Sequence, residues 1–92
     1  MKHILVKNAK DSVGNALQSI ETGESFCWEH AGSTVTLKAC TPVPFAFKVA
    51  LKDIKQGENV FCYGEPIGVA TSPIRCGECV HIHNLQGKRG NS

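Results

Sequence analysis

The sequence predicts one small, mainly β domain of short strands, with one or two short helical turns. Three observations favour this class. Apolar residues occur in short runs, a nine-residue segment recurs three times, and turn-forming residues separate the runs. With 92 residues, 41% of them hydrophobic, the chain is long enough for a single core and too short for a multidomain enzyme.

The recurring segment has the pattern Ala-x-x-x-Ile-x-x-Gly-Glu, and we call each copy a corner. The copies are ALQSIETGE (16–24), ALKDIKQGE (50–58) and ATSPIRCGE (70–78). We expect the Ala and Ile to point into the core, the Gly to provide a turn with positive φ, and the Glu to begin the next strand on its solvent side. The glycine near the end of every copy favours a turn or one helical turn over a full helix, and the unequal spacing excludes a solenoid.

Two hairpins are expected between the corners. Each consists of two runs of β-forming residues separated by residues typical of tight turns. The paired runs are 25–28 with 33–38, and 60–63 with 66–70. In the second run of the first hairpin, Val35 and Leu37 alternate with polar residues, which is typical of a strand with one buried face.

The ends of the remaining elements follow from composition. Pro42 and Pro44 mark a loop, and Val80 to His83 is expected to form the terminal strand. Residues 86–92 hold no apolar side chain. We therefore expect a domain over residues 1–85 and a flexible C-terminal tail over residues 86–92.

Charge and hydropathy exclude several classes of partner. The formal net charge is +2 and the basic residues are scattered, so nucleic acid is not expected as a partner. The longest apolar runs stop far short of the ~18 residues of a membrane span, and nothing reads as a signal peptide. We expect a cytoplasmic protein without membrane association, and its five cysteines as reduced, mostly buried thiols.

One cluster of residues could carry chemistry. Cys76, Cys79, His81, His83 and Asn84 lie within nine residues of one another. On an extended strand, residues 79, 81 and 83 would share a face and form a row of metal ligands. Zn²⁺, Fe²⁺ or Mn²⁺ could use two of them, with water or a partner's carboxylate completing the shell.

Other interpretations of this cluster stay open. A self-contained zinc site would need a second Cys/His pair, which the sequence does not offer. A thioredoxin-like dithiol at Cys76 and Cys79 would need a helix start after a strand, whereas this pair precedes a strand. In the simplest interpretation, His81 and His83 lie on the polar face of the terminal strand while Val80 and Ile82 pack inward.

The stretch from 49 to 85 resembles the SAF domain of the altronate and galactarate dehydratase family, also called UxaA-like. The shared residues, in order, are Tyr63-Gly64, Ile67-Gly68, Ala70 and His81-x-His83-Asn84-Leu85, and residues 11–17 and 22–24 resemble the opening of that domain. The resemblance implies a β-clip fold. Two departures stand out: Phe47 and Cys79 occupy positions where that family commonly has His.

The resemblance also implies a function. The domain would be a small subunit beside a large catalytic subunit, similar to the small subunit of sulfolactate sulfo-lyase. The reaction would be β-elimination from a small hydroxy acid, in which water leaves a sugar acid or sulfite leaves sulfolactate, assisted by a divalent metal (Fe²⁺, Mn²⁺ or Zn²⁺). A non-catalytic binding module, or a metal- or redox-responsive protein using Cys76 and Cys79, is the alternative.

Site residues carried over from the resemblance are few. His81 and His83 would be catalytic or, with Cys79, metal ligands. Asn84 and Lys48 would bind substrate. Because 92 residues offer no deep pocket, the large subunit would supply most of the site.

Overall fold

The computed structural model describes residues 1–87, which form nine strands and no helix. The mainly β class is confirmed, whereas the predicted helical turns are absent from these residues. No helix in this part of the chain is long and apolar enough to cross a membrane. The strands are β1 (Lys2–Leu5), β2 (Val13–Ala16), β3 (Ser25–His30), β4 (Ser33–Lys38), β5 (Lys48–Ala50), β6 (Asn59–Cys62), β7 (Glu65–Ala70), β8 (Cys79–Val80) and β9 (Leu85–Gly87).

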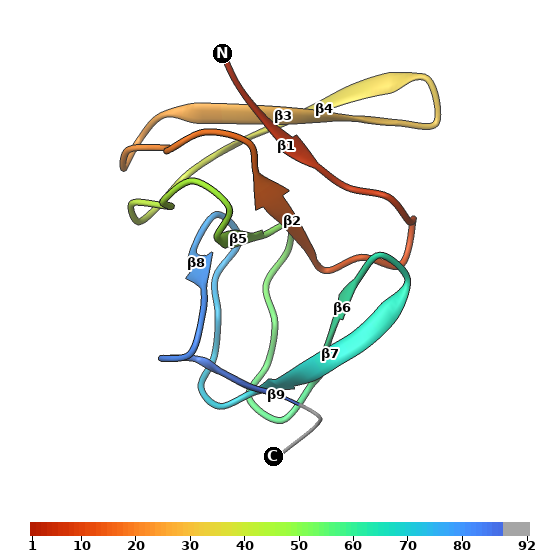
Figure 1. Cartoon of the computed structure of the whole chain (residues 1–92), viewed down its shortest axis with the longest axis vertical. Coiled ribbons are helices and arrows are strands. Elements are labelled where there is room, and N and C mark those ends of the chain that lie inside the picture. Colours follow the sequence, from red (N-terminus) through yellow and green to blue (C-terminus); the bar gives the residue numbers. More distant parts are fainter. Residues whose placement is uncertain (88–92) are drawn as a thin grey trace.

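The strands form two sheets (Figure 1). One has six strands in the order β4-β3-β1-β2-β5-β8, and the other has three in the order β6-β7-β9. Neighbouring strands are antiparallel except β1 and β3, which are parallel. Most pairings join segments far apart in the sequence, so the short strands depend on one another for their stability.

Both predicted hairpins are present, with two-residue turns. Ala31 and Gly32 join β3 to β4, and Tyr63 and Gly64 join β6 to β7. All four residues have positive φ, between 51° and 81°. Turns of this kind match the right-handed twist of the flanking strands, which explains why non-glycine residues are held there.

The three predicted corners are present, and the structure adds a fourth over residues 39–47. Each corner has a buried Ala, then a buried Ile or Val, then a residue with positive φ. The corners pair two by two through isolated bridges, Ile20 with Val43 and Ile54 with Ile74. The fourth corner cannot be recognised from the pattern because Ala46 and Phe47 replace its Gly and Glu; Ala46 nevertheless has a positive φ of 72°.

Paired corners exchange backbone hydrogen bonds. Gly57 N–H donates to Ala70 O and Gly77 N–H donates to Ala50 O, each at 2.8 Å. In the other pair, Gly23 N–H donates to Ala39 O at 2.8 Å and Ala46 N–H to Ala16 O at 2.9 Å. The positive φ directs each of these N–H groups toward the partner corner. The backbone hydrogen bonds of the corners are therefore made by pairing of two corners and not by formation of a helix.

The buried side chains form two clusters, not the single core expected. The first contains the pair of corners at 16–24 and 39–47, and the second contains the pair at 50–58 and 70–78. Strands β5 and β8 separate the clusters: Val49 and Cys79 belong to the first, and their neighbours Ala50 and Val80 to the second. Successive residues of a strand face opposite sides of the sheet. Each of these short strands, three residues in β5 and two in β8, therefore contributes side chains to both clusters.

The C-terminal prediction is partly wrong. The terminal strand ends at Val80, and residues 81–84 form a turn that leads into β9. Gln86 and Gly87, assigned above to the tail, pair with β7. The rest of the predicted tail, residues 88–92, lies outside the described residues.

Candidate functional site

His81 and His83 lie on a tight turn of residues 81–84, and the Asn84 side chain closes it. Asn84 Oδ1 accepts the His81 N–H at 2.9 Å, and Asn84 Nδ2 donates to the Cys79 carbonyl at 3.0 Å. The Asn84 N–H also donates to the His81 carbonyl at 3.0 Å. This side chain therefore satisfies backbone groups that the end of β8 leaves unpaired.

Asn84 is only 2% exposed. Its side-chain oxygen and nitrogen both form hydrogen bonds to the backbone, so Asn84 positions the turn that carries the two histidines. The substrate contact predicted for Asn84 does not fit this burial.

Phe47 packs against the ring of His81. The two ring centroids are 4.1 Å apart, with 30° between the planes. The register explains the contact: Lys48 pairs with Val80 across β5 and β8, so the preceding and following residues face each other. Phe47, at a position where the resemblance implies histidine, thus supports an imidazole instead of supplying one.

The turn also changes which side chains are exposed. His81 and His83 are exposed, as predicted, but Ile82 is 83% exposed rather than packed inward. The strand alternation ends at Val80 because the turn begins at the next residue. The predicted row of three ligands on one strand face is therefore wrong.

Cys79 lies in the first core cluster, 8% exposed, and its N–H donates to Thr41 Oγ1 at 2.9 Å. Burial, with a smaller effect of Glu78, raises the pKa of its thiol. Burial likewise raises the pKa of Cys76, with smaller effects of Asp53 and Cys40. Both shifts disfavour the thiolate that a metal ligand or a reactive dithiol requires.

Within residues 1–87, no three His, Cys, Asp or Glu side chains come together as a metal site. The two imidazoles of the turn would need ligands from another chain to hold a divalent cation. The residues described here do not assemble the metal centre that the sequence predicts, and its existence stays a prediction.

Lys48 belongs to the opposite face of the sheet. It pairs with Asn15 of β2, whose Nδ2 donates to Tyr63 Oη at 2.6 Å and to Cys62 Sγ at 3.9 Å. Burial raises the pKa of Cys62, partly offset by the charge of Lys48. Strand alternation separates Lys48 from His81, so the structure does not bring together all the residues predicted for one site.

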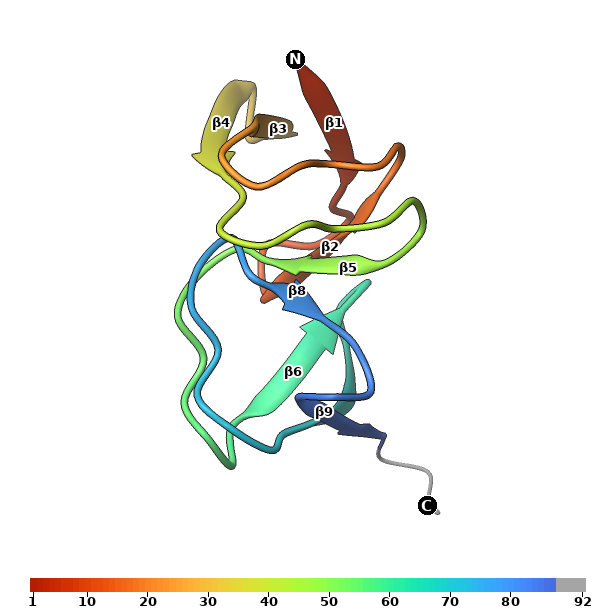
Figure 2. The same ribbon diagram turned by 90° about the vertical axis from the view of Figure 1, so that its left-hand side faces the viewer.

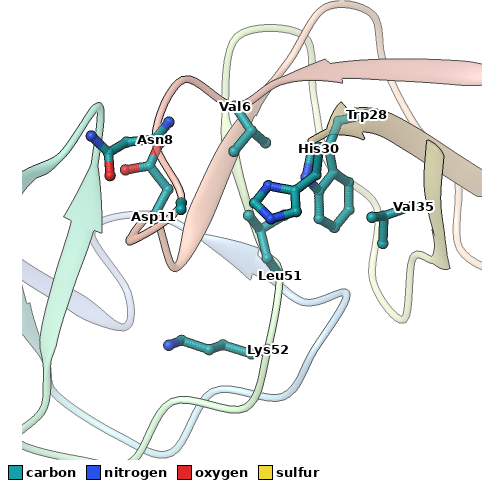
Figure 3. Close-up of a pocket in the computed structure, with 9 residues that line it drawn as sticks. Val6, Asn8, Asp11, Trp28, His30, Val35, Leu51 and Lys52 are labelled. Atoms are coloured by element: carbon teal, nitrogen blue, oxygen red, sulfur yellow. Dashed lines mark hydrogen bonds between the residues drawn. The ribbon is translucent and has the colours of Figure 1, made fainter. Parts of the chain in front are cut away.

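A shallow pocket of about 200 Å³ lies elsewhere, between the β1–β2 loop and the β3–β4 hairpin (Figure 3). It contains none of the predicted site residues; it is lined by Val6, Asn8, Ala9, Asp11, Trp28, His30, Val35, Leu51 and Lys52.

The only carboxylate lining this pocket, that of Asp11, already accepts hydrogen bonds from the backbone. Asp11 accepts the N–H groups of Lys7, Asn8 and Gly64 at 3.3, 3.1 and 2.8 Å. Those bonds tie the β1–β2 loop to the β6–β7 turn, which is a structural role. His30 and Lys52 are the remaining ionisable groups of the pocket, and the sequence offered no motif that pointed to them.

Comparisons with known proteins agree on one family. The family model described as the altronate/galactarate dehydratase SAF domain matches residues 2–88. The chain is 32% identical to (2R)-sulfolactate sulfo-lyase subunit alpha of Chromohalobacter salexigens, over 92% of this chain and 94% of that protein.

Altronate dehydratases match over a similar share of this chain. The identity is 34% to the enzyme of Bacillus subtilis and 39% to that of Escherichia coli, in each case over 94% of this chain. The chain spans only 16% of the length of either enzyme.

Proposed function

The chain belongs to the altronate/galactarate dehydratase SAF-domain family, and from this premise we propose that it is the small subunit of a two-subunit lyase. It would act beside a separate large catalytic subunit. The observation that carries the proposal is the match to a relative named subunit alpha, of which this chain covers 94%. The altronate dehydratases support the same chemistry, since they contain a segment similar to this chain.

The reaction proposed is β-elimination from a small hydroxy acid. A base removes the proton next to the carboxylate, water or sulfite leaves from the neighbouring carbon, and the resulting enol becomes a 2-keto acid. Imidazole is the side chain best suited to proton transfer near neutral pH. His81 and His83 are exposed on a turn held by Asn84, which supports a role for them at the edge of the large subunit's site.

A divalent metal, Fe²⁺, Mn²⁺ or Zn²⁺, would stabilise the charge that develops on the substrate. His81 and His83 would be this chain's ligands to it, and the large subunit would have to supply the others. Cys79 is not included, because its burial and raised pKa disfavour the thiolate.

Reconstitution tests this proposal. The chain would be mixed with the purified dehydratase-type large subunit of the same organism and assayed with altronate, galactarate and sulfolactate. We expect formation of a 2-keto acid, with sulfite release from sulfolactate if that is the substrate, only when both chains are present.

Two outcomes would count against it. A large subunit that is equally active alone would make this chain dispensable for catalysis. A chain that binds a sugar acid without changing the large subunit's activity would favour the non-catalytic binding module.

A further inference from the structure

Three large apolar side chains stand out on the side of the molecule that carries the histidine turn. Ile82 is 83% exposed, Phe45 is 64% exposed and Leu17 is 49% exposed. Single exposed apolar residues are ordinary on protein surfaces. These three come from segments far apart in the sequence, so their relative placement decides whether they form one surface.

Contacts join the three segments. Ala46 N–H donates to Ala16 O at 2.9 Å, and Phe45 N–H donates to Ser19 Oγ at 3.3 Å, so the fourth corner lies against residues 16–19. Phe47, two residues after Phe45, contacts His81 at 4.1 Å between ring centroids. Figure 2 shows the segments at 17–19, 44–47 and 81–83 along one side of the molecule.

We name this surface the corner face and define it as Leu17, Phe45, Phe47, His81 and Ile82. Four of its five side chains are apolar, and the fifth is the imidazole of His81, which packs against Phe47. The side chains of Phe45 and Ile82, 64% and 83% exposed, bury little apolar area in the isolated chain. Exposed apolar side chains gathered on one side of a molecule are typical of a protein interaction site.

The occupant follows from the relatives. The altronate dehydratases match this chain over 16% of their length, so most of such an enzyme lies outside the matched segment. The sulfo-lyase relative is named a subunit, which implies another subunit beside it. His81, one of the two candidate acid/base groups, belongs to the corner face, and a second copy of this chain seated there would close it off from any other catalytic group.

We propose that the corner face is the surface on which the large catalytic subunit docks, with His81 at the boundary between the two chains. This inference rests on the proposed function. It adds the location of the interface and explains why the hydrophobic side chains flank the histidine turn: they exclude water where the two chains share a site.

Paired aspartate substitutions test the inference. Ile82→Asp and Phe45→Asp each place a charge on the corner face. Ala9→Asp is the matched control, because Ala9 is an exposed apolar residue on the β1–β2 loop, on the opposite side of the molecule from β8 (Figure 1). Circular dichroism and thermal unfolding would verify that all three variants fold like the wild type.

The readout is the Kd for the purified large subunit, measured by calorimetry with the full chain. We expect each corner-face variant to raise the Kd at least about ten-fold and Ala9→Asp to change it less than about two-fold. If the wild type binds and both corner-face variants bind equally well, the docking surface is wrong while the proposed function stands.

Two further outcomes have distinct meanings. If the wild type does not bind the large subunit, the proposed function fails and the docking surface fails with it. If sedimentation shows that the wild type is a dimer that Ile82→Asp dissociates, the corner face is covered by a second copy, which overturns the choice of occupant.

Discussion

The two pairs of corners differ in how closely they follow one pattern. In the pair at 50–58 and 70–78, both corners keep the glycine and the glutamate. In the pair at 16–24 and 39–47, the second corner keeps neither, although its backbone makes the same hydrogen bonds. The irregular corner also packs a side chain against the histidine turn, since Phe47 lies against the ring of His81.

The glutamates of the regular corners explain why the fourth corner, which has Phe47 in place of glutamate, also has a proline at position 44. Glu58 and Glu78 accept the N–H groups of Lys55 and Arg75, three residues earlier, at 2.6 and 2.8 Å. In the fourth corner Pro44 occupies the position of that donor and has no N–H. No glutamate is needed there, so position 47 is free to hold a ring that packs against His81. The departure from the repeat therefore coincides with the contact between Phe47 and His81.

The largest expected effect comes from Gly77→Ala. Gly77 has φ of 87°, and an added Cβ would collide with the Lys38 carbonyl oxygen. Backbone strain and overpacking together predict a loss of about 3–5 kcal/mol in the free energy of unfolding, measured by urea denaturation. Gly57→Ala is the control, since Gly57 has φ of 88° but open space around it, and should lose only about 1 kcal/mol. Equal losses of stability in the two variants would show that the close approach of the Lys38 carbonyl does not constrain Gly77.

Asn84→Ala is expected to be the next most damaging change. It leaves the Cys79 carbonyl without its partner in a buried position and the His81 N–H without its partner in a part-buried one, at a cost of about 2–3 kcal/mol. Faster amide exchange at His81 would confirm that the turn has opened. Asn84→Asp keeps the acceptor, but it places a buried carboxylate oxygen against the Cys79 carbonyl, so at neutral pH it should cost at least as much stability as alanine. An Asn84→Ala variant as stable as the wild type would contradict the positioning role.

Ala46→Gly, in the irregular corner, is expected to raise stability, in contrast to the two preceding changes. Ala46 has φ of 72°, where glycine is less strained. We expect this variant to gain about 0.5 kcal/mol of stability, read from the midpoint of chemical denaturation. A loss of stability would mean that the methyl group of Ala46 makes contacts worth more than the strain.

The smallest effect concerns acid stability. The hydrogen bond from the Glu21 N–H lowers the pKa of Glu24; burial opposes this effect and Lys2 adds to it. The folded pKa is below the unfolded value, so this stabilisation is present above about pH 4.3 and is lost as pH falls through the folded pKa. Glu24→Gln should flatten that part of the stability profile in thermal unfolding scans. An unchanged slope would show that Glu24 is not linked to folding.

The sequence predicted the elements that glycine determines. The corners ending at Gly23, Gly57 and Gly77 and both hairpins were recognised, because turns with positive φ select glycine. The fourth corner was missed because Ala46 adopts that conformation under tertiary constraint. Strands β1, β2 and β5 were not predicted either, since three or four residues carry too little periodicity.

The candidate site was predicted only in part. The exposed histidines were located correctly, but a strand was expected where the Asn84 side chain forms a turn. Cys79 was counted as a ligand although its place in the core depends on packing against distant segments. Neither the contact of Phe47 with His81 nor the separation of Lys48 from it can be read without the register of β5 and β8.

The central claim is that the histidine turn contributes chemistry to a site shared with a large subunit. The most direct measurement is the kcat of the reconstituted complex with His81→Ala, compared with the wild type at saturating large subunit. We predict a loss of at least about 100-fold, the range expected for removing a general acid or base. The Kd for the large subunit should stay within about five-fold, since the flanking apolar anchors remain. A complex of His81→Ala that forms normally and retains the wild-type kcat would contradict the account.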